Sequence, residues 1–426
     1  MMTDPLDVEL NGTVIATAAT NGDEITIRFN EAYRSDPSAT PLSVSMPRTT
    51  TLHKGAGPAA WLWGLLPDND DVLRRWARDY DASVRSPLSY FATQIGLDCP
   101  GSVRFLPSTA EHPSVERDSG VNWLSDAELE ARINNLASDS TSWQGNRSAG
   151  QFSLAGAQAK TALRSDGTGR WGSPYGNEPS THILKPPVPG FDHQQINEHL
   201  CLSAATRLGL VAAATDVTTI GDHQILVVNR FDRHEASPNE WRRIHQEDMC
   251  QALGIHPSQK YQADGGPSAA DIAQLINRWT QPSVRARETQ RFLDALIYNW
   301  LIAGTDGHAK NYAFLHSGNQ TRLAPLYDIS SFLPYDDSRG HKLKLAMKIG
   351  GEYRIDRIRR TSWQRLAEDI GVDQTDLLDR CAELAKRVPG AFEQAAATLA
   401  EAPPFVDQLV EQVTAAASAR LGSIAA

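Results

Sequence analysis

The chain has few cysteines and no long apolar run. Its 426 residues include four cysteines, and no two of them form a C-x-x-C pair. That spacing excludes the common zinc and disulfide frameworks and favours isolated buried thiols. No eighteen consecutive residues are apolar, so a transmembrane helix is not expected. The four cysteines are Cys99, Cys201, Cys250 and Cys381.

Positive charge is also in short supply. The chain has 41 Lys and Arg against 51 Asp and Glu, a formal net charge of −10. Proteins that bind nucleic acid by themselves usually have a basic surplus, so any DNA contact here would be local or made through a partner. The start, MMTDPLDVEL, lacks the basic and then apolar order of a signal peptide, and we expect a cytoplasmic protein. No Walker A pattern occurs, which excludes a P-loop NTPase.

The first of three predicted domains covers residues 1–108. Residues 8–29 alternate as short strands, and Asn11-Gly12 between two of them is a strong hairpin pattern. Residues 58–96 have a helical pattern, and GSVRFLP, from Gly101, closes the domain as a strand. The apolar face of the helical part carries Trp61, Leu62, Leu65 and Leu66.

The second and third domains are predicted at 109–245 and 246–426. In the second, a helical pattern at 125–137 precedes the strand-like segments FSLAG, KTALR, THILK and DHQILVVNRF, with one helix around Glu198–Leu208. The third is helical except for a hairpin at 312–328. The predicted fold class is therefore α+β, with a mostly β part followed by a mostly α part.

The segment NWLIAGTDGHAKNYAFL, residues 299–315, is the most informative. A helix with apolar residues at helical spacing delivers a loop in which Asp306 and Asn311 are five residues apart. A protein-kinase catalytic loop places its base aspartate and its metal-binding asparagine at the same interval. One tight loop can then present a carboxylate to the attacking hydroxyl and an amide oxygen to a metal on the phosphates. By itself such a pattern is more often an Asp-Gly turn with an incidental asparagine, so the catalytic interpretation needs a partner residue.

Asp328 is the predicted partner of this loop. A strand, a turn at Ser317-Gly318-Asn319 and a second strand would bring the chain back so that Asp328 lies next to Asn311. In kinases an aspartate after a similar sheet segment binds the magnesium that bridges the phosphates. Hard oxygen ligands suit magnesium. The alternative is an aspartate that caps the following turn.

Lys185 is a candidate for holding the α/β-phosphates of ATP, and Glu198 is a candidate for positioning Lys185. Lys185 ends a predicted strand that Pro186-Pro187 stops, and Glu198 lies on the predicted helix. The alternatives are a solvent-facing strand lysine and a solvated helix face. For the phosphate loop itself, the residues leave two candidates open: GTGRWG at 167–172, which matches G-x-G-x-x-G, and SLAGAQAKT at 153–161.

The motifs SLAGAQAKTALR, THILKPP, NRFDR, HQEDMCQ, KYQADGGP, TDGHAKN and LYDISSF together resemble the HipA family of bacterial toxin kinases, from about residue 150 to 348. PLSVSMP, WGLLPDNDDVLRR and IGLDCPGSVRFLP resemble the amino-terminal subdomain of that family. The resemblance implies a kinase-like bilobal fold with an added small N-terminal α+β subdomain. It implies a serine/threonine kinase, the toxin of a type II toxin–antitoxin system, that phosphorylates a protein serine, as in an aminoacyl-tRNA synthetase, and arrests growth, with persistence as an outcome.

The partners that the resemblance implies are a HipB-like helix-turn-helix antitoxin and, through the antitoxin complex, operator DNA of its own operon. The implied cofactors are ATP and Mg²⁺. Two alternatives remain: a small-molecule kinase with the same site, and a catalytically silent, DNA-bound corepressor.

The resemblance also assigns roles to single residues. Asp306 is the general base, Asn311 and Asp328 bind magnesium, and Ser153 matches the autophosphorylated serine, although it could be a plain loop serine. It favours the 153–161 segment over GTGRWG as the phosphate loop. Asn229 and Ala159 each stand where we associate a glutamate with the family. The implied ATP-binding residues are Ala155, Gly156, Ala157, Gln158, Ala159, Lys160, Lys185, Asn229, Arg230, Phe231, His308, Asn311, Tyr327 and Asp328.

Overall fold

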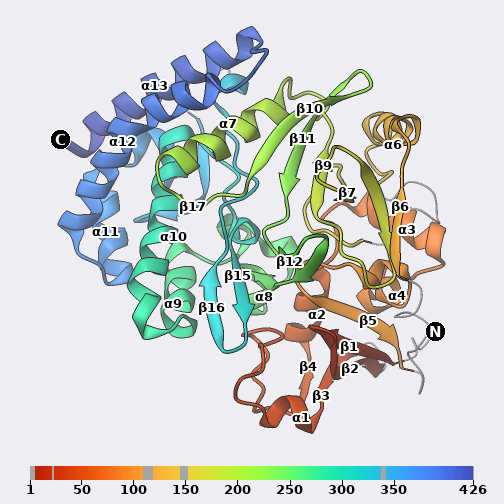
Figure 1. Cartoon of the computed structure of the whole chain (residues 1–426). Coiled ribbons are helices and arrows are strands. Elements are labelled where there is room, and N and C mark those ends of the chain that lie inside the picture. The colour runs from red at the N-terminus through yellow and green to blue at the C-terminus, as the bar shows by residue number, and fades with distance from the viewer. Residues whose placement is uncertain (1–4, 22–23, 109–118, 144–151, 337–341, 426) are drawn as a thin grey trace. The chain divides into compact units, whose positions relative to one another are not determined.

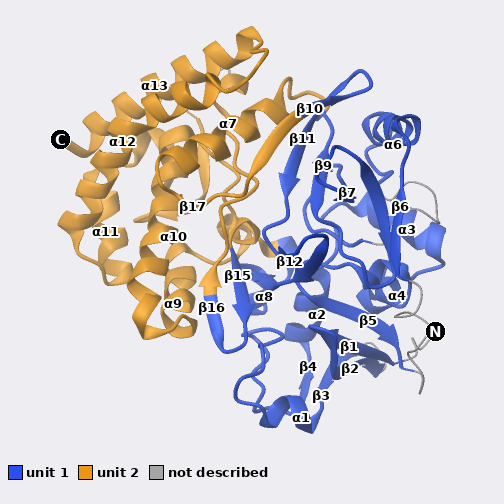
Figure 2. Cartoon of the chain, viewed as in Figure 1, with its two compact units in different colours: residues 1–188, 218–258, 313–321 blue, residues 189–217, 259–312, 322–426 orange. Residues whose placement is uncertain are grey.

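A computed structural model describes residues 5–21, 24–108, 119–143, 152–336 and 342–425 (Figure 1). The chain forms two compact units (Figure 2). Unit 1 contains residues 1–188, 218–258 and 313–321, and unit 2 contains residues 189–217, 259–312 and 322–426. Segments far apart in the sequence therefore fold together in each unit.

The first sheet of unit 1 is antiparallel, with its five strands in the order β4-β3-β2-β1-β5. The hairpin predicted at Asn11-Gly12 joins β1 to β2, and these two residues have positive φ angles of 51° and 80°. A two-residue type I′ turn requires such angles, which explains the Asn-Gly pair. The strands are β1 (Leu6–Leu10), β2 (Thr13–Asn21), β3 (Glu24–Phe29), β4 (Leu52–Lys54) and β5 (Val103–Pro107).

Short helices pack on this sheet and close a common apolar core. Trp61, Leu62, Leu65 and Leu66 are fully buried there, as predicted, although the helix that carries the first two ends at Gly64. Phe91 stacks on Phe105 with ring centroids 4.4 Å apart. The helices are α1 (Glu31–Ser35), α2 (Ala56–Gly64), α3 (Asp70–Tyr80) and α4 (Pro87–Phe91), with the 3-10 helix η1 (Gln94–Leu97).

The second sheet has six strands in the order β10-β11-β9-β7-β8-β6. The predicted strands KTALR, THILK and DHQILVVNRF correspond to β7, β9 and β11. Helix α6 (Asp126–Ser138), predicted at 125–137, begins at a capping box and packs Leu129 and Ile133 against Leu163 and Leu184 of the sheet. The strands are β6 (Gly120–Trp123), β7 (Thr161–Ser165), β8 (Trp171–Tyr175), β9 (His182–Lys185), β10 (Thr215–Ile220) and β11 (His223–Asn229).

FSLAG, predicted as a strand, is instead a loop at residues 152–156. Phe152 and Leu154 enter the core of the first sheet. The Ser153 N–H donates to the Asp98 carbonyl oxygen at 2.9 Å, and Gly156 forms an isolated bridge with Pro67. The prediction was wrong because the backbone of this segment bonds to residues of the N-terminal domain rather than to a neighbouring strand.

Unit 1 also contains a two-stranded hairpin, a further strand pair and a short helix. β12 (Arg233–Ser237) and β13 (Glu240–Arg243) form a hairpin, β14 (His245–Asp248) pairs with β15 (Ala313–Ser317), and α8 (Met249–Leu253) follows β14. The buried Glu247 carboxylate accepts hydrogen bonds from Ser43 Oγ at 2.6 Å and from the Val44 N–H at 2.9 Å, and pairs with His316 Nε2 at 3.0 Å. These bonds fix β14 to residues 43–44.

The neighbouring His245 makes the stability of the protein pH-dependent. Its ring is fully buried, and desolvation, with the nearby His316, lowers its pKa to about 4 although its Nε2 contacts the Leu42 carbonyl oxygen at 2.8 Å. In the unfolded chain the His245 ring binds a proton as the pH drops through about 6.5, whereas in the folded chain it stays neutral down to about pH 4. The free energy of unfolding therefore decreases as the pH is lowered from about 6.5 towards 4. In urea titrations at pH 7.5 and 5, we expect His245→Gln to lose about 1–2 kcal/mol less on acidification than the wild type. The exposed His234→Gln is the control, and equal losses in all three proteins would contradict the prediction.

Unit 2 is mainly helical. The predicted helix around Glu198–Leu208 is α7 (Gln194–Arg207). The predicted hairpin at 312–328 is formed by β15, which belongs to unit 1, and β16 (Gln320–Leu323), with its turn at Gly318, whose φ is 56°. The hairpin β17 (Lys344–Ile349) and β18 (Glu352–Arg354) was not predicted. The remaining helices are α9 (Ala269–Trp279), α10 (Pro282–Ile302), α11 (Arg360–Ile370), α12 (Gln374–Ala396) and α13 (Pro404–Ala425).

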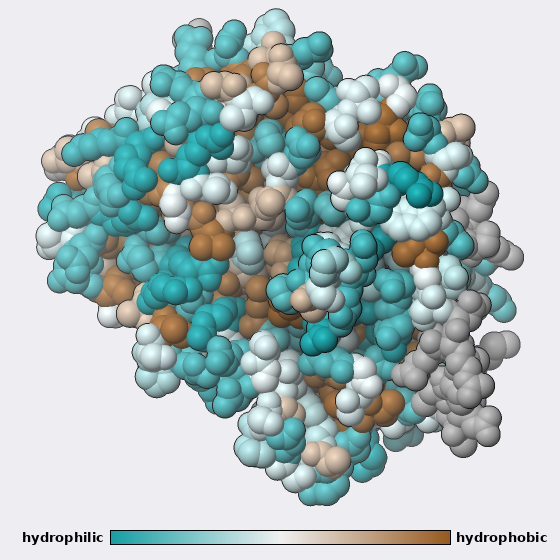
Figure 3. Space-filling view, viewed as in Figure 1, coloured by the Kyte–Doolittle hydropathy of each residue, from teal (hydrophilic) through white to brown (hydrophobic). Residues whose placement is uncertain are grey.

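The structure agrees with the absence of a long apolar run in the sequence. No helix in the described part of the chain is long and apolar enough to cross a membrane. On the face shown in Figure 3, hydrophilic residues cover most of the surface and the hydrophobic ones form small separate patches. The four cysteines are buried thiols, as predicted.

Candidate active site

Helix α10 delivers the loop that contains Asp306. Its C-terminal half is buried on nearly every face, which anchors the loop to the core of unit 2. The helix ends at Ile302, and the C-cap residue Ala303 adopts a left-handed conformation with φ 54° and donates its N–H to the carbonyl oxygens of Asn299 and Trp300. Gly304 follows, and a Cβ there would lie 2.2 Å from Asn299 Oδ1. A larger residue here would have to displace the Asn299 side chain, because the loop leaves the helix directly against it.

Hydrogen bonds within the loop fix the spacing of its polar residues. The His308 N–H donates to the Asp306 carbonyl oxygen at 2.7 Å, and the Asn311 N–H donates to the His308 carbonyl oxygen at 2.9 Å. The 3-10 helix η4 (Ala309–Asn311) ends the loop. Two consecutive tight turns therefore carry the chain from Asp306 to Asn311, and the five-residue interval has a structural basis.

Tyr261 contacts the Asp306 carboxylate, which the sequence did not predict. Its hydroxyl donates to Asp306 Oδ1 at 2.5 Å, and its ring packs edge-on against the His308 ring with centroids 4.9 Å apart. The adjacent Lys260 carbonyl oxygen accepts the Ala309 N–H at 3.2 Å. KYQADGGP is one of the motifs on which the resemblance rests, but no spacing rule connects Tyr261 with a loop 45 residues away.

Asp328 lies beside Asn311 within unit 2. Asn311 Nδ2 donates to the Asp328 carbonyl oxygen at 3.4 Å, and the Tyr327 hydroxyl donates to the Lys310 carbonyl oxygen at 2.7 Å. Asp328 has a φ of 52°, an angle that costs energy for a residue with a side chain and is often retained where a side chain must point in one direction. The structure therefore brings the neighbourhoods of Asn311 and Asp328 together.

The oxygen donors at this place fit a magnesium ion. Asn311 is 7% exposed, and its side-chain Oδ1 is buried without a hydrogen-bond partner among the described residues. A buried carbonyl oxygen without a partner is costly unless a ligand or water completes it. Magnesium prefers such oxygen ligands, takes few from the protein and keeps several waters. No group of three or more His, Cys, Asp or Glu residues in the described ranges could hold a metal, so a site here would use the amide of Asn311 together with Asp328.

Lys185 and Glu198 are both buried, each in its own unit. Lys185 ends β9 opposite Leu226 of β11 and is 3% exposed. Glu198 lies on α7 and is 2% exposed. Neither side chain therefore matches the alternative of a solvated strand or helix face. Charged residues are almost never this buried unless they are paired, which favours a specific role for both.

The loop at residues 153–160 is held by the N-terminal domain within unit 1. Ser153 is fully buried, and its Oγ donates to the Leu65 carbonyl oxygen. The Asp68 N–H donates to the Gly156 carbonyl oxygen at 3.1 Å. Lys160 Nζ reaches back to the Ala155 carbonyl oxygen at 2.8 Å, and Gly156, with φ 102°, leaves space for that ammonium group because a Cβ would lie 2.6 Å from it.

Residues 167–170 of GTGRWG form the exposed turn of the β7–β8 hairpin, whereas Trp171 and Gly172 belong to β8. Asp166 Oδ1 accepts hydrogen bonds from the N–H groups of Thr168 and Arg170, at 2.8 and 3.2 Å, and from the Thr168 hydroxyl at 2.8 Å. Two of the N–H groups that a phosphate loop would present are thus already bonded to a carboxylate. The assignment of the phosphate loop to residues 153–160 stays a prediction from the resemblance.

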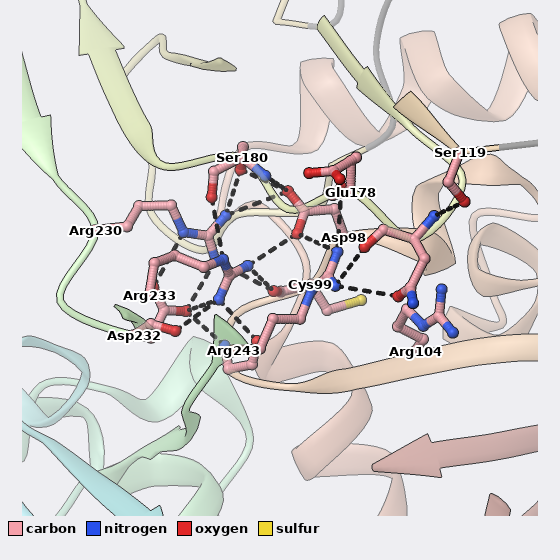
Figure 4. Close-up of polar contacts among 12 residues, drawn as sticks. Asp98, Cys99, Arg104, Ser119, Glu178, Ser180, Arg230, Asp232, Arg233 and Arg243 are labelled. Carbon is pink, nitrogen blue, oxygen red and sulfur yellow. Dashed lines mark hydrogen bonds and ion pairs between the residues drawn. The ribbon is translucent and has the colours of Figure 1, made fainter. Parts of the chain in front are cut away.

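Asn229, the last residue of β11, and the following Arg230 and Phe231 were predicted to bind ATP. Of these, Arg230 makes structural contacts with its side chain. Its guanidinium contacts Asp232 at 2.8 and 3.0 Å, the Ser180 hydroxyl at 2.9 Å and the Cys99 carbonyl oxygen at 3.2 Å (Figure 4). Its backbone N–H donates to the Thr181 carbonyl oxygen. A nucleotide contact at this strand end would therefore come from Asn229, which is exposed, or from the half-buried Phe231.

Comparisons with known proteins agree with this architecture. Residues 6–106 match the HipA N-terminal domain family, and residues 152–392 match the HipA-like C-terminal domain family. A protein of Sinorhizobium fredii named "Putative kinase Y4mE" is 31% identical over 404 residues, which are 90% of this chain and 91% of that protein. The serine/threonine-protein kinase toxin HipA of Shewanella oneidensis is 30% identical over 312 residues, 70% of this chain and 69% of the toxin.

A solved structure of the Shewanella oneidensis toxin–antitoxin system, a complex of HipA, HipB and operator DNA, contains a chain that matches with a TM-score of 0.83 and 26% identity. The match covers 98% of this chain and 97% of that chain. The sequence motifs, the two family matches and this fold agree. The chain belongs to the HipA family of serine/threonine kinase toxins, with the kinase-like α+β bilobal fold and the added N-terminal subdomain.

Proposed function

We propose that this protein uses ATP and magnesium to phosphorylate serine or threonine hydroxyls of a protein. The observation that carries the proposal is the arrangement in unit 2 of Asp306, Asn311 and Asp328. A tight loop presents the Asp306 carboxylate, and Asn311 offers a buried, unsatisfied oxygen next to Asp328. This combination suits a kinase, because one group must accept a proton while others hold the metal on the phosphates.

Each residue then has a defined task. Asp306 accepts the proton of the substrate hydroxyl while the hydroxyl oxygen bonds to the γ-phosphorus. The bond from the γ-phosphorus to the oxygen that bridges it to the β-phosphate breaks, and ADP leaves. Lys185 and the backbone of residues 155–160 bind the phosphates. Asn311 and Asp328 would hold magnesium, which, when bound, neutralises charge on the β- and γ-phosphates.

Tyr261 is expected to position the general base. Its hydroxyl holds Asp306 Oδ1, which leaves Oδ2 to accept the substrate proton. Tyr261→Phe should lower kcat about tenfold, the worth of one hydrogen bond to a charged group, and leave the KM for ATP unchanged. In an Asp306→Asn background the same change should have no further effect. Steady-state kinetics of the four proteins test this, with Tyr353→Phe as the control, and an equal loss in both backgrounds would contradict it.

The protein target and the antitoxin partner are proposed from relatives. One relative is named a serine/threonine-protein kinase toxin, and a solved relative is a complex with HipB and operator DNA. We propose a protein serine as acceptor, with an aminoacyl-tRNA synthetase as the target class and growth arrest as the outcome. A HipB-like helix-turn-helix antitoxin would bind the chain in the cytoplasm and bring it to operator DNA, which is consistent with a net charge of −10 that gives the chain little affinity for DNA by itself.

Ser153 is the proposed site of autophosphorylation. Because its hydroxyl is buried and bonded to Leu65, the loop must leave residues 65–68 before a phosphate can be attached. A dianionic phosphate cannot return to a fully buried position without a cation, so the modified loop would stay displaced. Phosphorylation would thereby remove the phosphate-binding loop from its place and inactivate the kinase.

Mass spectrometry after incubation with ATP and a bacterial protein extract tests the proposed function. We expect phosphoserine on at least one extract protein and on Ser153, both absent when Asp306 is replaced by Asn. Phosphate transfer to a small molecule alone would identify a small-molecule kinase. ATP binding and turnover that are both absent would support the silent corepressor.

A further inference from the structure

A polar cavity of about 560 Å³ lies in unit 1, and none of the residues that line it is assigned to ATP. One side is formed by the N-terminal domain, including Ser102 and Arg104, and the other by β13 and the residue after it, including Trp241, Arg242 and Arg243. The lining also includes the Glu9 carboxylate, which pairs with Arg104 at 2.7 Å, but the three arginines of the lining outnumber it. Arginine and aromatic side chains around a hollow of this size are typical of a site for an anionic ligand.

Beside the cavity, a buried ionic cluster has more positive than negative charge. Arg230, Arg233 and Arg243 contact Asp98 and Asp232 at 2.8 to 3.5 Å, all within unit 1 (Figure 4). Three guanidinium groups against two carboxylates leave a net charge of +1, and no other carboxylate of the described residues forms an ion pair with these arginines. Buried charges are normally compensated, so this surplus is unusual.

The electrostatics of single residues agree with a shortage of negative charge. Burial lowers the pKa of Arg233 to about 10 in spite of its two aspartates, and it also lowers the pKa of Arg243. Burial would raise the pKa of Asp98, but Arg233, Arg230 and Arg243 outweigh that effect and hold it below its usual value. Arg243, which lines the cavity, is the member of the cluster that an added anion could reach.

Three buried donors that belong to residues lining the cavity have no hydrogen-bond partner among the described residues. They are Arg104 Nη1, Arg243 Nε and Ser102 Oγ. Arg104 is 2% exposed, and its Nε and Nη2 are used by Glu9 at 2.8 and 2.7 Å, which leaves the third nitrogen unused. Ser102 is 2% exposed as well. Each such donor costs free energy unless a ligand or water accepts from it.

We propose that this cavity binds a phosphate-type oxyanion, either free or as the phosphate group of a larger ligand. The unused donors of Arg104, Arg243 and Ser102 would bind its oxygens, and its charge would balance the surplus of the buried cluster. Arginine forks match the spacing of phosphate oxygens, and the exposed Arg242, which pairs with Glu240 at 2.9 Å, adds a further guanidinium group at the rim. The inference depends only on unit 1 and stands independently of the proposed kinase activity.

Calorimetric titration of the full chain with inorganic phosphate, in saturating magnesium and a non-hydrolysable ATP analogue, tests this site. The analogue prevents phosphate from occupying a nucleotide site. We expect saturable binding of one phosphate per chain, weakened about fivefold or more by Ser102→Ala and by Arg242→Gln. Neither change breaks a bond of the buried cluster, so both variants should fold. Arg170→Gln, which removes an exposed arginine of the same unit that does not line the cavity, is the matched control.

The outcomes separate clearly. Absence of saturable binding, or equal affinity in wild type, Ser102→Ala and Arg242→Gln, would overturn the proposal. If phosphoserine binds more tightly than phosphate and is weakened by the same two changes, the ligand is a phosphate ester. If the free ion binds as well as or better than phosphoserine, the site is for the ion itself.

Discussion

Asp306→Asn is expected to lower kcat for phosphoryl transfer about a thousandfold, the typical contribution of a general base, while the Kd for ATP stays about the same. The asparagine keeps the size of the side chain, and its oxygen can still accept the hydrogen bond from the Tyr261 hydroxyl, so the loop should keep its shape. The variant cannot take the proton of the attacking hydroxyl. Single-turnover assays with labelled ATP and calorimetric ATP titration measure the two quantities separately.

The control for Asp306→Asn is Asp369→Asn, an exposed aspartate on α11 of the same unit, which should keep full activity. If the Asp306 variant keeps most of its rate, the general base is another group. If it loses ATP affinity as well as rate, Asp306 acts on the nucleotide or on the fold of the loop rather than on the acceptor hydroxyl. Either result would contradict the proposed role.

Of the substitutions proposed here, Asp98→Asn is expected to lower the free energy of unfolding the most. The Asp98 carboxylate accepts from Arg233 and Ser180 and pairs with Arg230 and Arg243, while its backbone oxygen holds Ser153 (Figure 4). The change would leave three buried guanidinium groups with the single carboxylate of Asp232. Breaking a buried ionic network in this way typically costs about 3–5 kcal/mol. Urea denaturation at pH 7 measures the loss, and the exposed Asp222→Asn serves as the control.

The pH dependence provides a second test of Asp98. Its pKa is depressed in the folded protein, so its contribution to stability is present above the unfolded value of about 3.9 and disappears as the pH falls through the folded value. The wild type and Asp98→Asn should therefore differ most near neutral pH and converge in acid below about pH 4. A constant difference at all pH values would show that packing, rather than charge, accounts for the loss.

Much of the site could be predicted because its residues are close in sequence. The Asp306–Asn311 interval follows from two tight turns, and the return of the chain to Asp328 follows from a hairpin around Gly318. The Asn11-Gly12 turn is predictable for the same reason, since positive φ angles favour these residue types. In each case a local turn requires particular residue types, so the turn can be recognised from a few neighbouring residues.

Contacts between distant segments could not be predicted from local patterns. Tyr261 reaches Asp306 across 45 residues, and Arg230 joins Asp98 across 132, without any periodicity that connects them. FSLAG has the composition of a strand, but its backbone bonds to Asp98 and to the segment at 65–68 and it becomes a loop. The buried positions of Lys185 and Glu198 likewise depend on elements packed from elsewhere in the chain.

A crystal structure with magnesium and a non-hydrolysable ATP analogue is the most direct test of the proposed chemistry. We predict that Asn311 Oδ1 and a carboxylate oxygen of Asp328 both lie about 2.1 Å from one magnesium ion that also contacts the analogue's phosphates. A metal ion bound to other residues, with Asn311 Oδ1 still lacking a ligand, would contradict the assignment of this site.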